Sequence, residues 1–354
     1  MTTELLAPAG GQEALIAAVQ SGADAVYMGF GAFNARRSAR NFSNEEFRAA
    51  VSYCHLRGVK VYLTLNTLVT DRELPALAKE ALTASECGVD AILVQDWGVL
   101  ATLQKIIPDV PLHASTQMSL HTLSGVKEAA RLGMTRAVLA RELSREEIAE
   151  ICASSPIEIE TFVHGALCMC YSGQCEMSAV IGRRSGNRGA CAQPCRLPYG
   201  FSGKADGHPL SLKDANLAPF VPEMMDLGVA CLKIEGRMKR PEYVAAVTEI
   251  YARLLREHRA PTKDEQKKLA LAFSRDGFTE GYYRGVRGRE MFGTRPENAR
   301  WPEDWFSEVR ARYEKENLRL VPLALNCTIR VGQPMTLTAE DADGHRVTVT
   351  GAVP

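Results

Sequence analysis

The stretch CGVDAILVQD, residues 87–96, places a glycine directly before a short and almost continuous apolar run. A glycine just after a helix tolerates the left-handed backbone that ends the helix. An apolar run without alternation is typical of a parallel strand that is buried on both faces. The segment therefore predicts the end of a helix followed by a buried parallel strand.

The same arrangement recurs in SGADAVYMG (21–29), RGVKVYLTLN (57–66), LGMTRAVLAR (132–141) and LGVACLKIEG (227–236). With the other apolar runs, the eight candidate strands are Glu4–Ala7, Ala25–Met28, Lys60–Leu65, Ala91–Gln95, Leu112–Ser115, Ala137–Arg141, Glu158–Val163 and Cys231–Glu235. Eight strands that alternate with helices favour a closed (β/α)8 barrel of the TIM type. The alternative is an open doubly wound sheet, but no Gly-x-Gly-x-x-Gly phosphate turn follows the first strand.

The spacing of the strands fails once, between the seventh and the eighth. We expect residues 1–260 to form the barrel, with a cysteine-rich insertion at 164–200 that leaves the C-terminal end of strand seven. Barrel enzymes keep their chemistry on that face. Residues 261–317 are expected to form a mixed helical and loop extension. The alternating pattern of 318–354 indicates the start of a small β domain, which we expect to be truncated.

Composition narrows the functional classes. The 354 residues include 42 basic and 42 acidic side chains, so any site for a polyanion must be a local patch. No apolar run of about 18 residues and no signal peptide is present, and we expect a cytoplasmic protein without a membrane partner. In that reducing compartment, the ten cysteines indicate metal ligands or catalytic thiols before disulfides.

Five of these cysteines are concentrated in one segment. Cys168, Cys175, Cys191 and Cys195 follow the pattern C-x6-C-x15-C-x3-C, with Cys170 as a fifth thiol. Four thiolates suit a 4Fe–4S cluster. Structural zinc usually takes cysteines in closely spaced pairs, and only the last two fit, so zinc stays open as the weaker alternative. A lone catalytic thiol beside His164 would leave the other cysteines unexplained.

Polar side chains at the ends of the predicted strands are candidates for the barrel mouth. His113, Ser115 and Gln117 alternate and should share one face of strand five. The candidate catalytic residues are His113, Gln117, His164 and Glu235. The candidate substrate-binding residues are Arg36, Asn66, Arg141, Lys233 and Arg237. For each of them, a role in a structural ion-pair network is an equal alternative.

The residues then show a family resemblance. The motifs F-x-H-G-A-L-C at 162–168, Y-S-G-Q-C at 171–175 and N-R-G-x-C-x-x-x-C-R at 187–196 resemble the signature of the collagenase-like peptidases of family U32. L-L-A-P-A-G at 5–10 and K-I-E-G-R at 233–237 fit as well. The chain is most similar to the branch of ribosomal-RNA cytidine hydroxylases.

The resemblance implies an oxygen-independent hydroxylase that uses a 4Fe–4S cluster and takes its hydroxyl group from prephenate. It implies Cys168, Cys175, Cys191 and Cys195 as the ligands. Because prephenate is a dicarboxylate, Arg36, Arg141 and Arg237 are candidates to bind it bidentately. A peptidase, as the family name says, and a non-catalytic module with structural zinc remain the alternatives.

RNA is the expected macromolecular partner. The residues that would form a basic rim for phosphates are Arg183, Arg184, Arg188, Arg196, Arg237, Lys239 and Arg240. Tyr171 and Tyr199 would stack an unpaired base. The alternative is a solubilising loop with both tyrosines packed in the protein.

Overall fold

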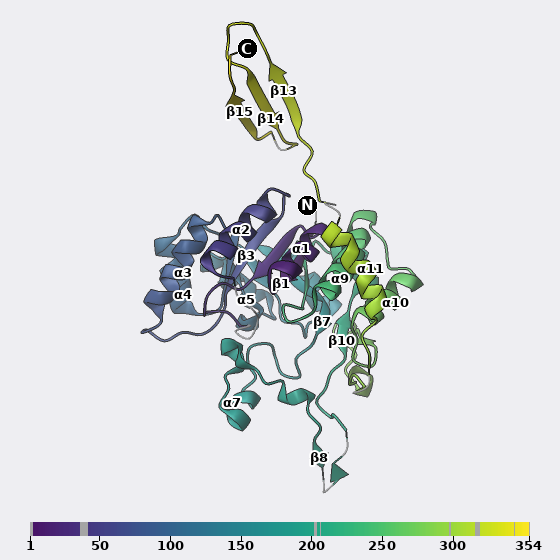
Figure 1. Ribbon diagram of the computed structural model, residues 1–354. Coiled ribbons are helices and arrows are strands. Elements are labelled where there is room, and N and C mark those ends of the chain that lie inside the picture. Colours follow the sequence, from purple (N-terminus) through teal and green to yellow (C-terminus); the bar gives the residue numbers. More distant parts are fainter. Residues whose placement is uncertain are drawn as a thin grey trace.

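The computed structural model describes residues 3–35, 42–201, 204–205, 207–296, 299–315, 319–342 and 344–353. Its centre is a parallel barrel with helices around it (Figure 1). The barrel strands are β1 (Glu4–Ala9), β2 (Ala25–Met28), β3 (Lys60–Leu65), β4 (Ala91–Val94), β5 (Leu112–Ala114), β6 (Arg136–Val138), β7 (Glu158–Ala166) and β11 (Cys231–Ile234). β11 pairs with both β7 and β1, which closes the barrel and confirms the predicted (β/α)8 fold.

The helices that cover the barrel begin and end largely as the sequence predicts. They are α1 (Gln12–Gln20), α2 (Asn44–His55), α3 (Leu74–Glu86), α4 (Trp97–Ile106), α5 (Leu123–Arg131), α6 (Arg145–Ser154), α8 (Val221–Asp226) and α9 (Pro241–Glu257). Ser43 and Ser144 form capping boxes at the starts of α2 and α6. Gly88 follows α3 with a φ of 85°, which a side chain would strain.

The barrel interior contains charges near its N-terminal end. Arg136 Nη1 lies 2.7 Å from Glu4 Oε1 and 3.5 Å from Glu160 Oε2, and Lys233 Nζ lies 2.7 Å from Glu160 Oε1. Tyr62 donates a hydrogen bond to the Glu4 carboxylate at 2.8 Å. The Glu160 carboxylate is fully buried, so it stabilises the fold only while these cations surround it.

The connection from β7 to β11 contains the cysteine-rich insertion. It includes α7 (Met177–Gly182), the short pair β8 (Gly200–Phe201) and β9 (Lys204–Ala205), and β10 (Asp214–Asn216). β10 runs antiparallel to the end of β7 and pairs on its other side with β12 (Phe278–Thr279). The insertion therefore lies at the C-terminal end of β7, as predicted, and its return strand extends the barrel wall.

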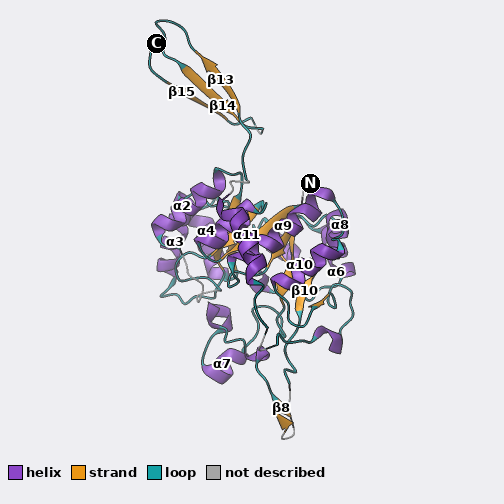
Figure 2. Cartoon of the chain, turned by 45° about the vertical axis from the view of Figure 1, so that its right-hand side comes forward, coloured by secondary structure: helices purple, strands orange, loops and turns teal. Residues whose placement is uncertain are grey.

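The rest of the chain forms an extension and a separate sheet. α10 (Lys263–Ala272) and α11 (Glu303–Lys315) pack on α9. β13 (Ala324–Thr328), β14 (Thr336–Glu340) and β15 (Arg346–Thr350) form an antiparallel sheet that projects from the barrel (Figure 2). Within the described ranges, no helix combines the length and the apolar character needed to cross a membrane.

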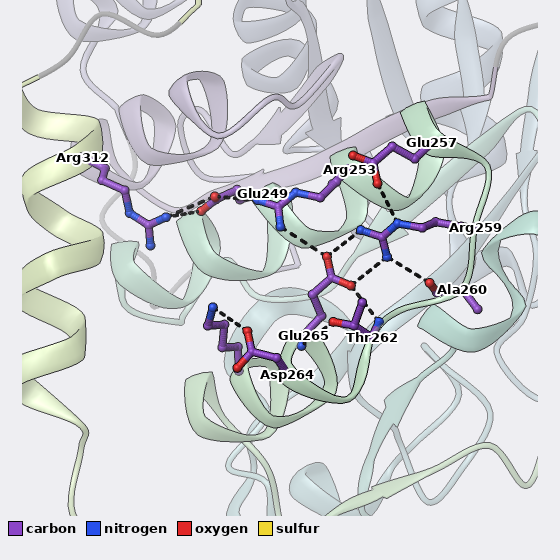
Figure 3. A network of polar contacts seen from close by, with 10 residues as sticks. Glu249, Arg253, Glu257, Arg259, Ala260, Thr262, Asp264, Glu265 and Arg312 are labelled. Atoms are coloured by element: carbon purple, nitrogen blue, oxygen red, sulfur yellow. Dashed lines mark hydrogen bonds and ion pairs between the residues drawn. The ribbon is translucent and has the colours of Figure 1, made fainter.

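A polar network fixes α10 against the end of α9 (Figure 3). Arg259 donates two hydrogen bonds to the carboxylate of Glu265, at 2.8 and 2.9 Å, and Arg253 donates a third at 3.3 Å. The same carboxylate accepts the backbone N–H of Thr262, which completes a capping box. The Arg259 guanidinium lowers the pKa of Glu265 to about 2.

We predict that Glu265→Gln lowers the free energy of unfolding by about 2 kcal/mol at pH 7, because the buried carboxylate that accepts from two partly exposed arginines loses its charge. Since folding lowers the pKa of Glu265, its contribution is complete above the ordinary value of 4.5 and is lost as the pH falls toward 2. Urea unfolding of both proteins between pH 7 and pH 3 measures the difference, which should narrow below pH 4.5.

Glu257→Gln is the matched control, because Glu257 also pairs with Arg259 but is 44% exposed and caps no helix. Its effect should stay within about 0.5 kcal/mol. Equal effects of the two substitutions would contradict this account of the network.

Candidate active site at the barrel mouth

The cysteine-rich insertion begins directly after β7. Cys168, Cys170, Cys175 and Cys195 are partly buried, and Cys191 is exposed. Burial raises the pKa of Cys195, and the negative charges of Cys168, Cys191 and Cys175 raise it further, whereas Arg196 lowers it. Cys195 therefore lies close enough to the other three predicted ligand thiols to be affected by their charges.

Polar groups of the insertion contact one of these sulfurs. The Gln193 N–H donates to Cys191 Sγ at 3.3 Å, and the Ser178 hydroxyl lies 3.8 Å from the same sulfur. Such donors stabilise a thiolate. In the part of the chain that the structure describes, no three His, Cys, Asp or Glu side chains converge tightly enough to hold a single metal ion.

An amide network covers the barrel mouth beneath the insertion. Asn66 Nδ2 donates to Ser115 Oγ at 3.0 Å, and Gln117 Nε2 donates to the Asn66 carbonyl at 2.7 Å. Asn187, from the insertion, donates to Gln95 Oε1 at 2.8 Å and to Gln117 Oε1 at 3.2 Å. The structure thus brings together Asn66 and Gln117, two of the predicted residues. Gln117 lies on a 3-10 turn after β5 and not on the strand itself.

Two further contacts hold the insertion on the barrel. The guanidinium of Arg188 binds the carboxylate of Glu73, in the loop before α3, and donates to the Leu68 carbonyl at 3.2 Å. Gly173 has a φ of 84°, and a Cβ there would lie 2.8 Å from the Gln117 backbone. Only glycine allows the insertion to approach the mouth this closely.

Arg141 and Glu235 form an ion pair at the ends of β6 and β11. Arg141 Nη2 lies 2.8 Å from Glu235 Oε2, and Arg141 Nη1 donates to the Ala166 carbonyl at 3.2 Å. The guanidinium also lies over the ring of Phe162, 3.9 Å from its centroid. The buried Nε of Arg141 has no hydrogen-bond partner among the described residues. One donor therefore remains for a ligand.

Lys233 and His113 lie on β11 and β5, whereas Arg237 follows the C-terminal end of β11. Lys233 is the partner of Glu160 within the barrel. Arg237 donates to the Thr64 hydroxyl at 2.9 Å and is 6% exposed. His113 packs edge-on against Tyr62, and burial together with the Arg136 and Lys233 charges lowers its pKa. Each of the three side chains therefore has a partner within the protein.

His164 faces away from the barrel interior. Its ring packs against Tyr243, Tyr251 and Phe278, and its Nδ1 lies 3.3 Å from the Tyr251 hydroxyl. Burial lowers the pKa of His164 to about 3, so the imidazole is neutral. The expectation that it points into the mouth is wrong because a β-bulge in β7 puts His164 beside Ile234, on the outer face.

Most of the predicted basic rim is already engaged. Arg188 binds Glu73, Arg196 binds the Leu167 and Leu212 carbonyls, and Arg240 binds Glu242 and Glu303. Arg183 and Arg184 remain exposed. The ring of Tyr171 is exposed and stacks on His121, whereas Tyr199 bonds to the Pro194 carbonyl. Arg36 lies outside the described residues.

Asn187 and Gln95, which connect the insertion to the barrel, are hard to identify from the sequence. Asn187 lies in a glycine-rich segment without periodicity, and Gln95 follows its strand like any polar residue. The one signal for Asn187 is its place in the motif N-R-G-x-C beside Cys191.

The chain is similar to known proteins over most of the segment that forms the barrel and the insertion. Residues 10–292 match the family described as Peptidase family U32. The "23S rRNA 5-hydroxycytidine C2501 synthase" of Escherichia coli (strain K12) is 41% identical over 288 residues, which cover 79% of this chain and 42% of that protein. The chain thus spans less than half of that relative.

Two relatives of more similar length carry different names. The "tRNA hydroxylation protein P1" of Bacillus subtilis (strain 168) is 36% identical over 310 residues, covering 82% of this chain and 73% of the relative. The "Collagenase" of Porphyromonas gingivalis (strain ATCC BAA-308 / W83) is 36% identical over 310 residues, covering 80% and 74%. The resemblance inferred from the cysteine signature is confirmed, and the chain belongs to peptidase family U32.

Proposed function

We propose that this chain is an oxygen-independent hydroxylase of an RNA pyrimidine that works with a 4Fe–4S cluster and takes its hydroxyl group from prephenate or a similar dicarboxylate. The observation that carries the proposal is the placement of the cysteine-rich insertion directly after β7 at the barrel mouth, where Cys168, Cys175 and Cys191 lie near enough to act on Cys195. Cytidine in ribosomal RNA is the proposed target, since the relative with 41% identity is named for that product.

Cys168, Cys175, Cys191 and Cys195 would hold the cluster. The fit rests on the donor set, which consists of thiols near one another, with a backbone N–H and a hydroxyl directed at Cys191. When bound, such a cluster supplies a Lewis-acidic iron that polarises a hydroxyl group of the donor. Cys170 is left as a spare thiol.

Zinc fits this arrangement less well. Structural zinc sites usually take their cysteines in pairs two to four residues apart, and here only Cys191 and Cys195 have that spacing. The wide spacing of Cys168 and Cys175 supports iron–sulfur over zinc.

The residues around the thiols would bind and orient the substrates. The amide network of Asn66, Gln117 and Asn187 offers neutral donors and acceptors that suit the edge of a base. The free Nε of Arg141 offers a charged donor beside them. The exposed ring of Tyr171, backed by His121, would stack an unpaired pyrimidine. The insertion packed over the mouth would exclude water.

The peptidase alternative lacks its nucleophile pair. A cysteine peptidase needs a histidine in hydrogen-bond contact with a thiol. Across the described ranges, Nδ1 of His164 contacts the Tyr251 hydroxyl, and its buried Nε2 has no hydrogen-bond partner. The geometry therefore supports the hydroxylase, even though one relative is named a collagenase.

Substitution of single cysteines tests which thiols bind the cluster. Cys175→Ser and Cys191→Ser should each remove most of the bound iron and the broad visible absorption of anaerobically purified protein, because each removes a cluster ligand. Cys170→Ser should keep both. Cys327→Ser, in the exposed strand β13, is the control for a thiol far from the site. Equal iron in all four variants would contradict the ligand assignment.

The expected product is a hydroxylated pyrimidine in RNA. A host that lacks this protein should lose one hydroxylated pyrimidine from its ribosomal or transfer RNA, as measured by mass spectrometry of nuclease digests. Wild-type protein and the Cys327→Ser variant should restore it, whereas Cys175→Ser should reduce it at least a hundredfold. Unchanged RNA, together with gelatin cleavage that depends on Cys168, would instead support a peptidase.

A further inference from the structure

Three cationic side chains surround the ring of Phe273, in the loop that follows α10. Lys239 Nζ lies 2.8 Å from the ring centroid, and the guanidinium carbons of Arg275 and Arg295 each lie 5.0 Å from it. Arg295 also lies over Trp301, at 4.2 Å. The three cations come from separate segments: the turn after β11, the loop before β12, and the segment before α11. The fold therefore gathers like charges that repel one another.

The acidic side chains nearby do not balance this charge. Asp214, on β10, is 1% exposed and pairs with Arg275. Glu235 acts on Lys239 only at longer range and is already bound by Arg141. Among the described residues, neither Lys239 nor Arg295 forms an ion pair, and Asp214 is bound by Arg275. The described cations of this cluster therefore outnumber the carboxylates that pair with them.

The excess charge is costly where it lies. Arg275 is only 14% exposed, and burial together with the neighbouring arginines lowers the pKa of Lys239 to about 7. Partial burial strengthens repulsion among cations, just as it strengthens attraction to an anion. The contacts with the Phe273 and Trp301 rings offset part of this cost, and a bound dianion would remove the rest.

The cluster lies next to the cysteine site. Asp214 pairs in register with Ala166, two residues before Cys168. Arg196, whose charge acts on both Arg275 and Asp214, donates to the Leu167 carbonyl and also acts on Cys195. A ligand held by Arg275 would therefore lie on the side of the insertion that carries Cys168 and Cys195.

We propose that Lys239, Arg275 and Arg295 form a binding site for a small organic dianion with two carboxylates. Guanidinium groups bind carboxylates bidentately, and the rings of Phe273 and Trp301 hold the cations in place. The low exposure of Arg275, 14%, favours a small molecule over the phosphates of a nucleic acid, which bind exposed cations. In the proposed function, this dianion is the hydroxyl donor, and that identification alone rests on the proposed function.

Calorimetric titration of the whole anaerobic protein with succinate tests the site. Inorganic phosphate and a short single-stranded oligoribonucleotide serve as the competing probes. Arg295→Gln should weaken succinate binding about tenfold, since it removes one charge-assisted contact, and Arg275→Gln should weaken it by a similar factor. Arg131→Gln, which removes an equal charge from an exposed pair on α5, should leave the affinity unchanged.

Arg295→Gln is the more informative substitution, because it leaves Asp214 paired with Arg275. Arg275→Lys covers the case in which Arg275→Gln does not fold, and it should retain charge but lose affinity. The proposal is overturned if wild-type protein does not bind succinate or if Arg295→Gln binds it equally well. It is also overturned if only oligonucleotide affinity depends on these arginines. Intact succinate binding without RNA hydroxylation would refute the proposed function and leave this site standing.

Discussion

The buried pair of Glu160 and Lys233 links the two strands on which the rest of the site depends. Glu160 lies on β7 and Lys233 on β11, and their contact at 2.7 Å has no access to water. Breaking a pair of this kind leaves an uncompensated charge inside the barrel, which costs about 3–5 kcal/mol. β7 and β11 must therefore stay adjacent, and because they run parallel, the connection between them leaves β7 at the mouth and returns to β11 at the opposite end of the barrel. The cysteine-rich insertion is that connection. Its thiols are confined to one side of the barrel by the closure of the barrel itself.

Several contacts attach the insertion to the barrel mouth. They explain why its cysteines lie beside the residues at the strand ends. Asn187 bridges Gln95 and Gln117, Arg188 binds Glu73, and Gly173 lets the backbone pass against Gln117. These contacts are polar and local, so they fix the position of the insertion without a large apolar interface.

Near the extension, the junction of α9 and α10 orients the loop that carries Phe273 and Arg275. The net charge of the chain is zero, yet Lys239, Arg275 and Arg295 gather around Phe273, and among the described residues only Arg275 of the three has an ion-pair partner. The neutral composition thus conceals a local anion site.

The barrel itself could be predicted from the sequence because its signals are local. A glycine after five of the barrel helices and an apolar run in each strand are properties of single segments, and all eight strands lie where the pattern places them. The site could be predicted only in part. The position of Cys168 follows from the end of β7, but the outward turn of His164 depends on a bulge that strand alternation does not reveal. Arg141 and Lys233 carry charges that invited a role in substrate binding, yet their partners Glu235 and Glu160 are distant in sequence. The short strands β10 and β12 have two or three residues each and no apolar pattern, so the path of the insertion back to the barrel was not predictable.

The central claim is that the insertion holds an iron–sulfur cluster beside the barrel mouth. Quantification of iron, zinc and acid-labile sulfide in one anaerobic preparation of the whole protein tests it most directly. The account predicts about four irons and about four sulfides per chain with little zinc. One zinc per chain with no labile sulfide would contradict it.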